Sequence, residues 1–268
     1  MRNAPGKING FDWDVLDARV DVIGALILRD MRTRFGRSHL GYLLAVAWPL
    51  THLITITTIM SIANRVVPIG TEPAVFISSG VLPYILCLYP ARTMGLSIET
   101  NRLLFLFPAV TPINVIIARG IIEFLTAALV VILFFIGASI LGVNVLPANY
   151  STWLVSVLST IYFSISMGLI NTVIGSIFKF WHVFFLVIMF GMYSSSGAFV
   201  LPSNLPQSTQ NAMWYNPLFH CVEWIRSSYF EGYGDGNLSQ FYLLSFATCL
   251  LFLGLLGERF IRGKLLFQ

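Results

Sequence analysis

The stretch PINVIIARGIIEFLTAALVVILFFIGASIL, residues 112–141, decides the fold of this chain. Only Arg119 and Glu123 carry a charge in it. An apolar run of this length crosses roughly 30 Å of hydrocarbon as an α-helix. The apolar residues are continuous rather than alternating, which argues against a strand of a membrane β-barrel. The stretch is therefore predicted to be a membrane-spanning helix.

The rest of the chain has the same character. Of its 268 residues, 56% are hydrophobic and only 10% are charged, whereas soluble domains contain about 25% charged residues. A water-soluble protein is excluded on this ground. The sequence predicts an all-α, polytopic membrane protein with a single transmembrane domain. Its six spans are predicted at residues 40–63, 74–91, 112–141, 153–177, 181–200 and 238–257.

The charge distribution predicts the orientation of these spans. The net charge of +4 could suggest a nucleic-acid partner, but its placement gives another account. With six spans and a cytoplasmic N-terminus, fourteen of the 16 Lys and Arg residues lie inside, and only Arg65 and Arg226 lie outside. Positive charge accumulates in cytoplasmic loops. We therefore expect both termini in the cytoplasm and no nucleic acid as a partner.

An amphipathic helix is predicted before the first span. Residues 1–14 are polar and form a loose tail, and residues 15–38 follow as the helix. Its apolar positions recur at spacings of three and four, at Leu16, Val20, Ile23, Ile27, Met31 and Phe35. Its basic residues, placed to meet phospholipid head groups, are Arg29, Arg32, Arg34 and Arg37. The helix is expected on the cytoplasmic surface, and a helix packed on a partner protein is the alternative.

Two connections between spans differ from the rest. The cytoplasmic connection, residues 95–111, carries Glu99, Asn101 and Arg102 in a short polar segment. The external connection, residues 201–237, is too long for a passive loop. Two short helices are predicted in it, around residues 205–215 and 217–230.

The external connection is rich in aromatic residues, for which two interpretations stay open. They are Trp214, Tyr215, Phe219, Trp224, Tyr229, Phe230 and Tyr233. They could form a belt at the level of the lipid head groups. Alternatively, some of them could form a lid over an exit, because flat rings offer a sliding polymer apolar contact. Glu223 and Arg226 are three residues apart, so they could pair and fix such a lid.

Catalytic and metal-binding patterns do not stand out. The sequence has neither His-Glu-x-x-His nor Gly-x-Ser-x-Gly. His52 is expected to be a polar residue bonded inside the bundle. Cys87, Cys221 and Cys249 are odd in number and widely separated, which argues against a disulfide framework or a metal site.

A nucleotide-binding loop is also missing from the sequence. Residues 257–263 begin and end with Gly and precede Lys264, but five residues separate the glycines instead of four. Leu265 stands where a hydroxyl residue would hold magnesium. Any ATP-driven work is therefore assigned to another polypeptide.

Arg119 and Glu123 are the charges placed deepest in a span. Four residues apart on a helix, they can face each other and reduce the cost of burial. They could transmit force or contact a substrate, or they could form a structural pair near the cytoplasmic boundary. The spans otherwise lack the series of carboxylates expected of a proton- or sodium-coupled carrier.

Three segments carry a resemblance to a known family. The first contains Arg29-Asp30-Met31-Arg32-Thr33-Arg34-Phe35-Gly36, Leu40-Gly41-Tyr42-Leu43 and Pro49. The second contains Ile98-Glu99-Thr100-Asn101, Leu104-Phe105, Pro112 and Ile117-Ala118-Arg119 with Glu123. The third contains Asn216-Pro217-Leu218, His220, Val222-Glu223, Arg226 and Gly232-Tyr233. Together they resemble permease subunits of ATP-binding-cassette polysaccharide exporters, most of all those that export capsular polysaccharide in Gram-negative bacteria. Leu44 departs from the pattern, since the family often has Trp there.

The resemblance implies an assembly and a division of labour. A homodimer would form the channel for a polysaccharide, and a cytoplasmic ATPase subunit carrying ATP and magnesium would dock on each copy. This chain itself would bind no cofactor and would not be an enzyme. Periplasmic adaptor and outer-membrane export proteins would extend the path. A membrane-embedded glycosyl or acyl transferase and a passive scaffold or channel are the competing hypotheses.

The resemblance also suggests roles for particular residues. The residues expected to couple the chain to the ATPase are Glu99, Thr100, Asn101, Arg102, Arg29, Arg32 and Arg34. The residues expected at an external gate or along the substrate path are Asn216, Pro217, His220, Glu223, Trp224, Arg226 and Tyr229.

Overall fold

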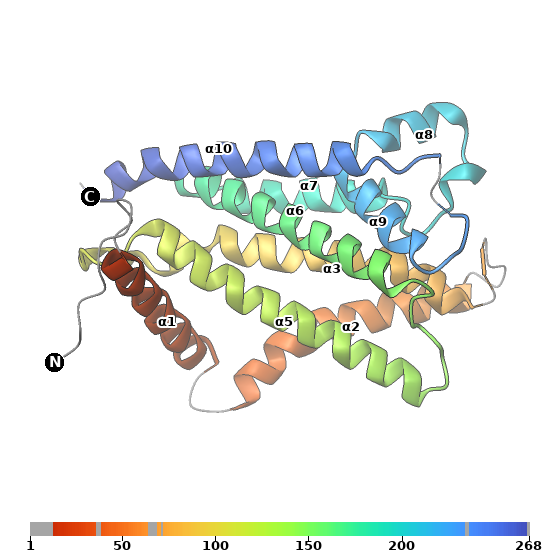
Figure 1. Cartoon of the computed structure of the whole chain (residues 1–268), viewed down its shortest axis with the longest axis horizontal. Coiled ribbons are helices and arrows are strands. Elements are labelled where there is room, and N and C mark those ends of the chain that lie inside the picture. The colour runs from red at the N-terminus through yellow and green to blue at the C-terminus, as the bar shows by residue number, and fades with distance from the viewer. Residues whose placement is uncertain (1–12, 36–38, 64–68, 71, 234–235, 267–268) are drawn as a thin grey trace.

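The computed structural model describes residues 13–35, 39–63, 69–70, 72–233 and 236–266. This part of the chain contains ten α-helices and two 3-10 helices, which confirms the all-α prediction. Five helices hold stretches long and apolar enough to cross a membrane, and they lie side by side along the long axis of the molecule (Figure 1). They are α2 (His39–Ala63), α3 (Pro73–Gly95), α5 (Pro112–Ile140), α6 (Tyr150–Ile177) and α10 (Gln240–Leu266).

Helix α3 lies at the centre of the bundle, in contact with α2, α5, α6 and α9 (Pro217–Ser227). It runs through Pro90 and ends at Gly95, one turn beyond the predicted span, which stopped at residue 91. Neighbouring side chains help to satisfy its last turns, as is usual around proline in membrane helices. The Asn171 side chain donates to the Ala91 carbonyl at 2.8 Å, and Thr172 Oγ1 donates to the Met94 carbonyl at 2.8 Å.

The predicted fifth span, residues 181–200, is where the six-span prediction is not confirmed. Helix α7 (Trp181–Ser194) has only 14 residues. At 1.5 Å per residue it is about 21 Å long, which is short of the roughly 30 Å of hydrocarbon in a bilayer. The chain then turns, and Gly197 takes a positive φ of 75° that favours glycine. Ser196 and Ala198 are buried in this turn. Residues 195–201 therefore form a packed turn and do not continue the helix.

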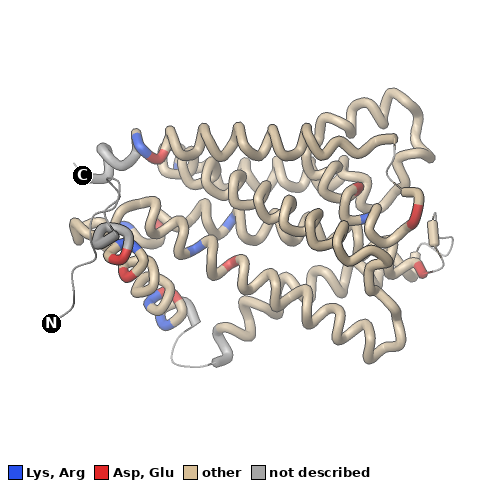
Figure 2. Tube along the Cα trace, in the orientation of Figure 1, with Lys and Arg blue, Asp and Glu red and all other residues tan. Residues whose placement is uncertain are grey.

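The two ends of the bundle carry different elements. One end holds α1 (Trp13–Phe35), α4 (Ser97–Thr100) and the 3-10 helix η1 (Arg102–Leu106), together with the last turns of α10 (Figure 1). Charged residues gather mainly at this end (Figure 2). The other end holds 3-10 helix η2 (Pro202–Asn204) and α8 (Gln207–Trp214).

Several predicted boundaries are confirmed and others move. The tail predicted for residues 1–14 lies outside the described residues except for its last two, which open α1. The amphipathic helix is present, and its last predicted residues, 36–38, lie outside the described part. Both short external helices exist, as α8 and α9, although α9 ends at Ser227. Helix α10 continues beyond the predicted end at residue 257, because its charged last turns extend the helix past the apolar stretch.

Candidate functional site

The candidate residues expected on the cytoplasmic side lie on and around α1. Helix α1 packs on α5 through Leu26, which contacts Val115 and Ala118 and lies outside the predicted apolar face, with Ile23 and Ile27 of that face beside the contact. Next to this apolar contact, Arg29 Nη2 donates to Asn101 Oδ1 at 2.7 Å. The structure therefore brings together two of the residues expected to couple to an ATPase. Arg32 is exposed on the same helix, and the side chain of Arg34 lies outside the described side chains.

The coupling segment, which we define as residues 96–107, consists of α4 and η1 with their flanking residues. Asn101 is buried, and its Nδ2 donates to the Ser97 carbonyl at 2.8 Å, which fixes the junction between α4 and η1. Glu99, Thr100 and Arg102 are exposed. The Glu99 carboxylate lies 3.4 Å from Nε2 of His182, at the start of α7. The segment is thus attached to the bundle on one side and open on the other.

Arg119 has a partner that the sequence analysis missed. Its Nη1 donates to Oδ2 of Asp30 on α1 at 3.1 Å, and both side chains are largely buried. The predicted Arg119–Glu123 pair stays a prediction. A sequence signal for Asp30 existed, because this carboxylate stands three residues after Ile27 and four after Leu26, on the apolar side of α1.

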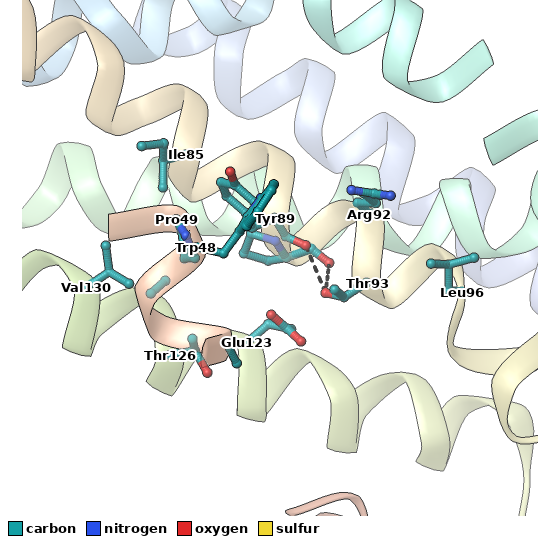
Figure 3. A pocket seen from close by; sticks show the side chains of 13 residues that line it. Trp48, Pro49, Ile85, Tyr89, Arg92, Thr93, Leu96, Glu123, Thr126 and Val130 are labelled. Carbon is teal, nitrogen blue, oxygen red and sulfur yellow. Dashed lines mark hydrogen bonds between the residues drawn. The ribbon is translucent and has the colours of Figure 1, made fainter. Parts of the chain in front are cut away.

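A cavity of about 300 Å³ lies between α2, α3 and α5 (Figure 3). Its lining combines aromatic, hydroxyl and charged side chains, which are typical of polar ligand sites. The main members of the lining are Trp48, Tyr89, Arg92, Thr93, Glu123 and Thr126. Tyr89 is held by His52, whose Nδ1 lies 3.0 Å from the Tyr89 hydroxyl, as expected for a histidine bonded inside the bundle. Trp48 is largely exposed, so the cavity opens at the surface of the single chain.

Helix α9 forms a buried polar site at the other end of the bundle. Arg226 is 0% exposed, and its two terminal nitrogens donate to the carbonyls of Gly197 and Ala198, each at 3.0 Å. Its guanidinium also stacks 4.1 Å from the centre of the Phe76 ring. The predicted Glu223–Arg226 pair is confirmed, with Glu223 Oε1 at 3.7 Å from Arg226 Nη1. Arg226 therefore attaches the turn after α7 to α3 and α9.

Glu223 is held by a second group besides Arg226. The hydroxyl of Tyr233 donates to Glu223 Oε1 at 2.6 Å. Burial raises the pKa of Glu223, and both Arg226 and the Tyr233 hydrogen bond act in the opposite direction. This cluster borders a cavity of about 240 Å³ whose lining also includes Ser203 and Asn237.

The start of α9 is fixed by Asn216, Pro217 and His220. The Asn216 side chain accepts from the Leu218 N–H at 2.9 Å and so caps the helix, and Pro217 occupies its first turn. His220 Nδ1 accepts from the Ser239 N–H at 3.2 Å, so Nε2 carries the hydrogen and donates to the Trp214 carbonyl at 2.8 Å. Burial lowers the pKa of His220, which favours this neutral form. These residues join α8, α9 and the start of α10.

The aromatic residues of the external connection divide into buried and exposed members. Trp224 is 5% exposed and Phe219 is fully packed, so the interfacial belt does not apply to them. Tyr215, 72% exposed, stays compatible with a belt. Tyr229 is partly buried beside Phe230, at a third cavity near residues 144–150. The external-gate role of all these residues stays a prediction.

Replacing Trp224 by Leu should therefore destabilise the protein. Loss of a buried indole removes packing and leaves a cavity, with an expected cost of about 2–4 kcal/mol. The measurement is the temperature at which purified protein in detergent loses its monodisperse elution peak. Tyr215→Leu, at an exposed ring, is the matched control and should leave that temperature unchanged. Equal values for the two variants would contradict the buried position of Trp224.

Five long apolar helices in the described part of the chain, with an amphipathic helix at one end of the bundle, are the features of a multi-span membrane protein. No known family model matches the chain. The polysialic acid transport protein KpsM of Escherichia coli is 32% identical over 235 residues, covering 87% of this chain and 90% of that protein. Two capsule polysaccharide export inner-membrane proteins are also similar. CtrC of Neisseria meningitidis serogroup A is 27% identical over 90% of this chain and 92% of its own length. BexB of Haemophilus influenzae is 26% identical over the same shares.

The chain therefore belongs to the family of capsule polysaccharide export inner-membrane proteins. The resemblance seen in its three sequence segments is confirmed, and so is its location in the inner membrane.

Proposed function

We propose that this chain is the membrane subunit of an ATP-driven exporter that moves capsular polysaccharide across the inner membrane. Two copies form the channel, and a separate ATPase subunit docks on each copy at the coupling segment. ATP and magnesium bind to the ATPase, since the chain lacks a nucleotide-binding loop of its own. Periplasmic and outer-membrane export proteins continue the path of the polymer.

One observation carries this proposal, the exposed apolar surface of the coupling segment. Leu103 and Leu106 are each 79% exposed, and Phe107 beside them is 61% exposed. They belong to η1 and the residue after it, outside the apolar stretches of the spans. Clustered apolar side chains facing water usually mark a protein contact. Exposed Glu99 and Arg102 flank them and give that contact a charge pattern.

The cavity between α2, α3 and α5 supports a polymer path. Trp48 and Tyr89 offer rings on which a sugar can slide, and Thr93, Thr126 and Arg92 offer hydrogen bonds. The relative KpsM is a transport protein for polysialic acid, which is an acidic polymer. An arginine in the lining fits a polymer of that charge.

The test of the function is export by the whole complex. The chain and its co-expressed ATPase should purify together, and surface polysaccharide should disappear when either is deleted. An ATPase variant that binds but cannot hydrolyse ATP should leave the polymer inside the cell. Normal surface polysaccharide in the absence of this chain would refute the proposal. Polymer that is shortened or chemically altered rather than retained inside would favour a transferase.

The proposed orientation predicts where single cysteines react. In a background without Cys87, Cys221 and Cys249, a cysteine at Ser208 of α8 should react with a membrane-impermeant thiol reagent in intact cells. A cysteine at Leu103 should react only after the membrane is opened. Both positions are exposed in the chain, and cells without the ATPase keep its docking from covering position 103, so the membrane alone should make the difference. Labelling of position 103 in intact cells would contradict the proposed orientation and indicate the opposite one.

A further inference from the structure

Two consecutive residues of α1, Arg29 and Asp30, form contacts with two different parts of the structure. Arg29 donates to Asn101 in the coupling segment at 2.7 Å. Asp30 accepts from Arg119 on α5 at 3.1 Å. We call these four residues the α1 latch. Its members come from three segments that are far apart in the sequence, so the contact is a tertiary one.

Apolar packing surrounds the latch on the same face of α1. Leu26 is buried with Val115 and Ala118 of α5, and Leu104 and Phe105 of η1 pack against this cluster. Helix α1 therefore touches the coupling segment and α5 through both polar and apolar contacts. An interfacial anchor would need only a lipid-facing apolar side and no such pair of contacts.

The coupling segment reaches α5 directly through an irregular stretch of chain and through the packing of α4 on α5, with Ile98 and Ile116 in one apolar cluster. In the stretch of chain, residues 107–111 are not helical, and Phe107, Pro108 and Ala109 are exposed. Helix α1 adds a second route, because Arg29 binds the coupling segment while Leu26 packs on α5. A packed helix transmits a displacement better than an exposed loop, because close-packed contacts are hardly compressible.

Helix α5 leads from the latch to the cavity. Arg119 is one turn before Glu123, and Glu123, Thr126, Ala127 and Val130 line the cavity between α2, α3 and α5. A shift or rotation of α5 at Arg119 would therefore reach the cavity lining directly.

We propose that α1 transmits movement of the coupling segment to α5 through the α1 latch, with Asp30 as the residue that positions α5. This inference rests on the proposed function, in which an ATPase moves the coupling segment. The buried pair is suited to the task, because its geometry is specific and separating it leaves a charge in a poorly solvated place.

The test exchanges the two charges in the complete complex with its ATPase. Asp30→Arg alone and Arg119→Asp alone should each lower polysaccharide export by about tenfold or more, while ATP hydrolysis stays within about threefold of the wild type. The double variant, Asp30→Arg with Arg119→Asp, should recover export to within about threefold, since it restores an opposite pair. Asp21→Asn, at an exposed carboxylate on the same helix, is the matched control and should export normally. All comparisons are made at equal membrane levels.

Other outcomes decide against the latch. Normal export by either single variant would overturn it, and so would a double variant no better than the singles. A parallel fall of hydrolysis and export would mean that Asp30 serves ATPase docking instead. If a charge-reversed variant is present in the membrane in lower amounts, Asp30→Asn replaces it in the test. This variant is also expected to lose polysaccharide export and to keep ATP hydrolysis. The wild-type complex tests the proposed function separately. If the ATPase hydrolyses ATP at the same rate with and without this chain, the proposed exporter itself is refuted.

Discussion

Replacing Arg226 by Met should unfold the end of the protein that holds α8 and α9. The side chain is completely buried and donates to the carbonyls of Gly197 and Ala198 while it lies beside Glu223. Methionine fills a similar volume but leaves two carbonyls without this donor and Glu223 without its cation. Breaking a buried ion pair from one side costs about 3–5 kcal/mol. This is a large part of the stability of a typical protein domain.

The measurement is the membrane level and the thermal midpoint of the purified variant. Arg19→Met, at an exposed arginine of α1, is the matched control and should behave as the wild type. Combining Arg226→Met with Glu223→Gln should recover part of the loss, because the uncompensated carboxylate is then removed. A wild-type midpoint for Arg226→Met would contradict the buried network.

Reversing the charge of Glu99 should separate ATP hydrolysis from polymer export. The carboxylate is exposed in the coupling segment, 3.4 Å from His182. Glu99→Arg would present a positive charge to the ATPase and would place a guanidinium next to the imidazole. Since reversed charges at an interface disfavour correct docking, we expect export to fall by about tenfold or more. Hydrolysis by the bound ATPase should fall much less.

Surface polysaccharide and ATP hydrolysis in membranes are the two measurements for Glu99. Glu99→Gln separates loss of the charge from its reversal and should have a smaller effect. Glu72→Arg reverses an exposed carboxylate at the start of α3, whose other end leads to the coupling segment, and should export normally. Export by Glu99→Arg at the wild-type level would place the docking surface elsewhere.

The helices were predictable where local chemistry decides them. Helix α5 begins at Pro112 as expected, because proline suits the first turn of a helix, and its apolar run then leaves no alternative. The two external helices were placed by the Asn216-Pro217 break and by the length of the connection. The end of α7 was missed, although Ser194-Ser195-Ser196-Gly197 interrupts the apolar run there. The turn there depends on Arg226, which follows in the sequence much later.

In the candidate site, too, features encoded by local sequence were predicted, whereas contacts between distant segments were not. The amphipathic pattern predicted that α1 is a helix but not its packing on α5 through Leu26, and the polar segment between α3 and α5 was recognised from its composition. The pairing of Arg119 with Asp30 was missed, because the partners are 89 residues apart and a helix offers a nearer carboxylate at Glu123. The cavity was missed as well, since its lining comes from three helices whose arrangement no local pattern specifies.

The position of α9 has a consequence for how the protein is made. Helices α3 and α6 contact each other, and both also contact α9, which is synthesised after them. While the ribosome still makes residues 178–216, α3 and α6 can already insert, but the site for α9 beside them stays empty. Gly80 of α3, where any larger side chain would collide with Ala198 and Arg226, then faces lipid or an insertion factor. Final compaction of the bundle must therefore wait until α9 has been translated, and a ribosome-bound intermediate truncated before Pro217 should be membrane-inserted yet open to protease.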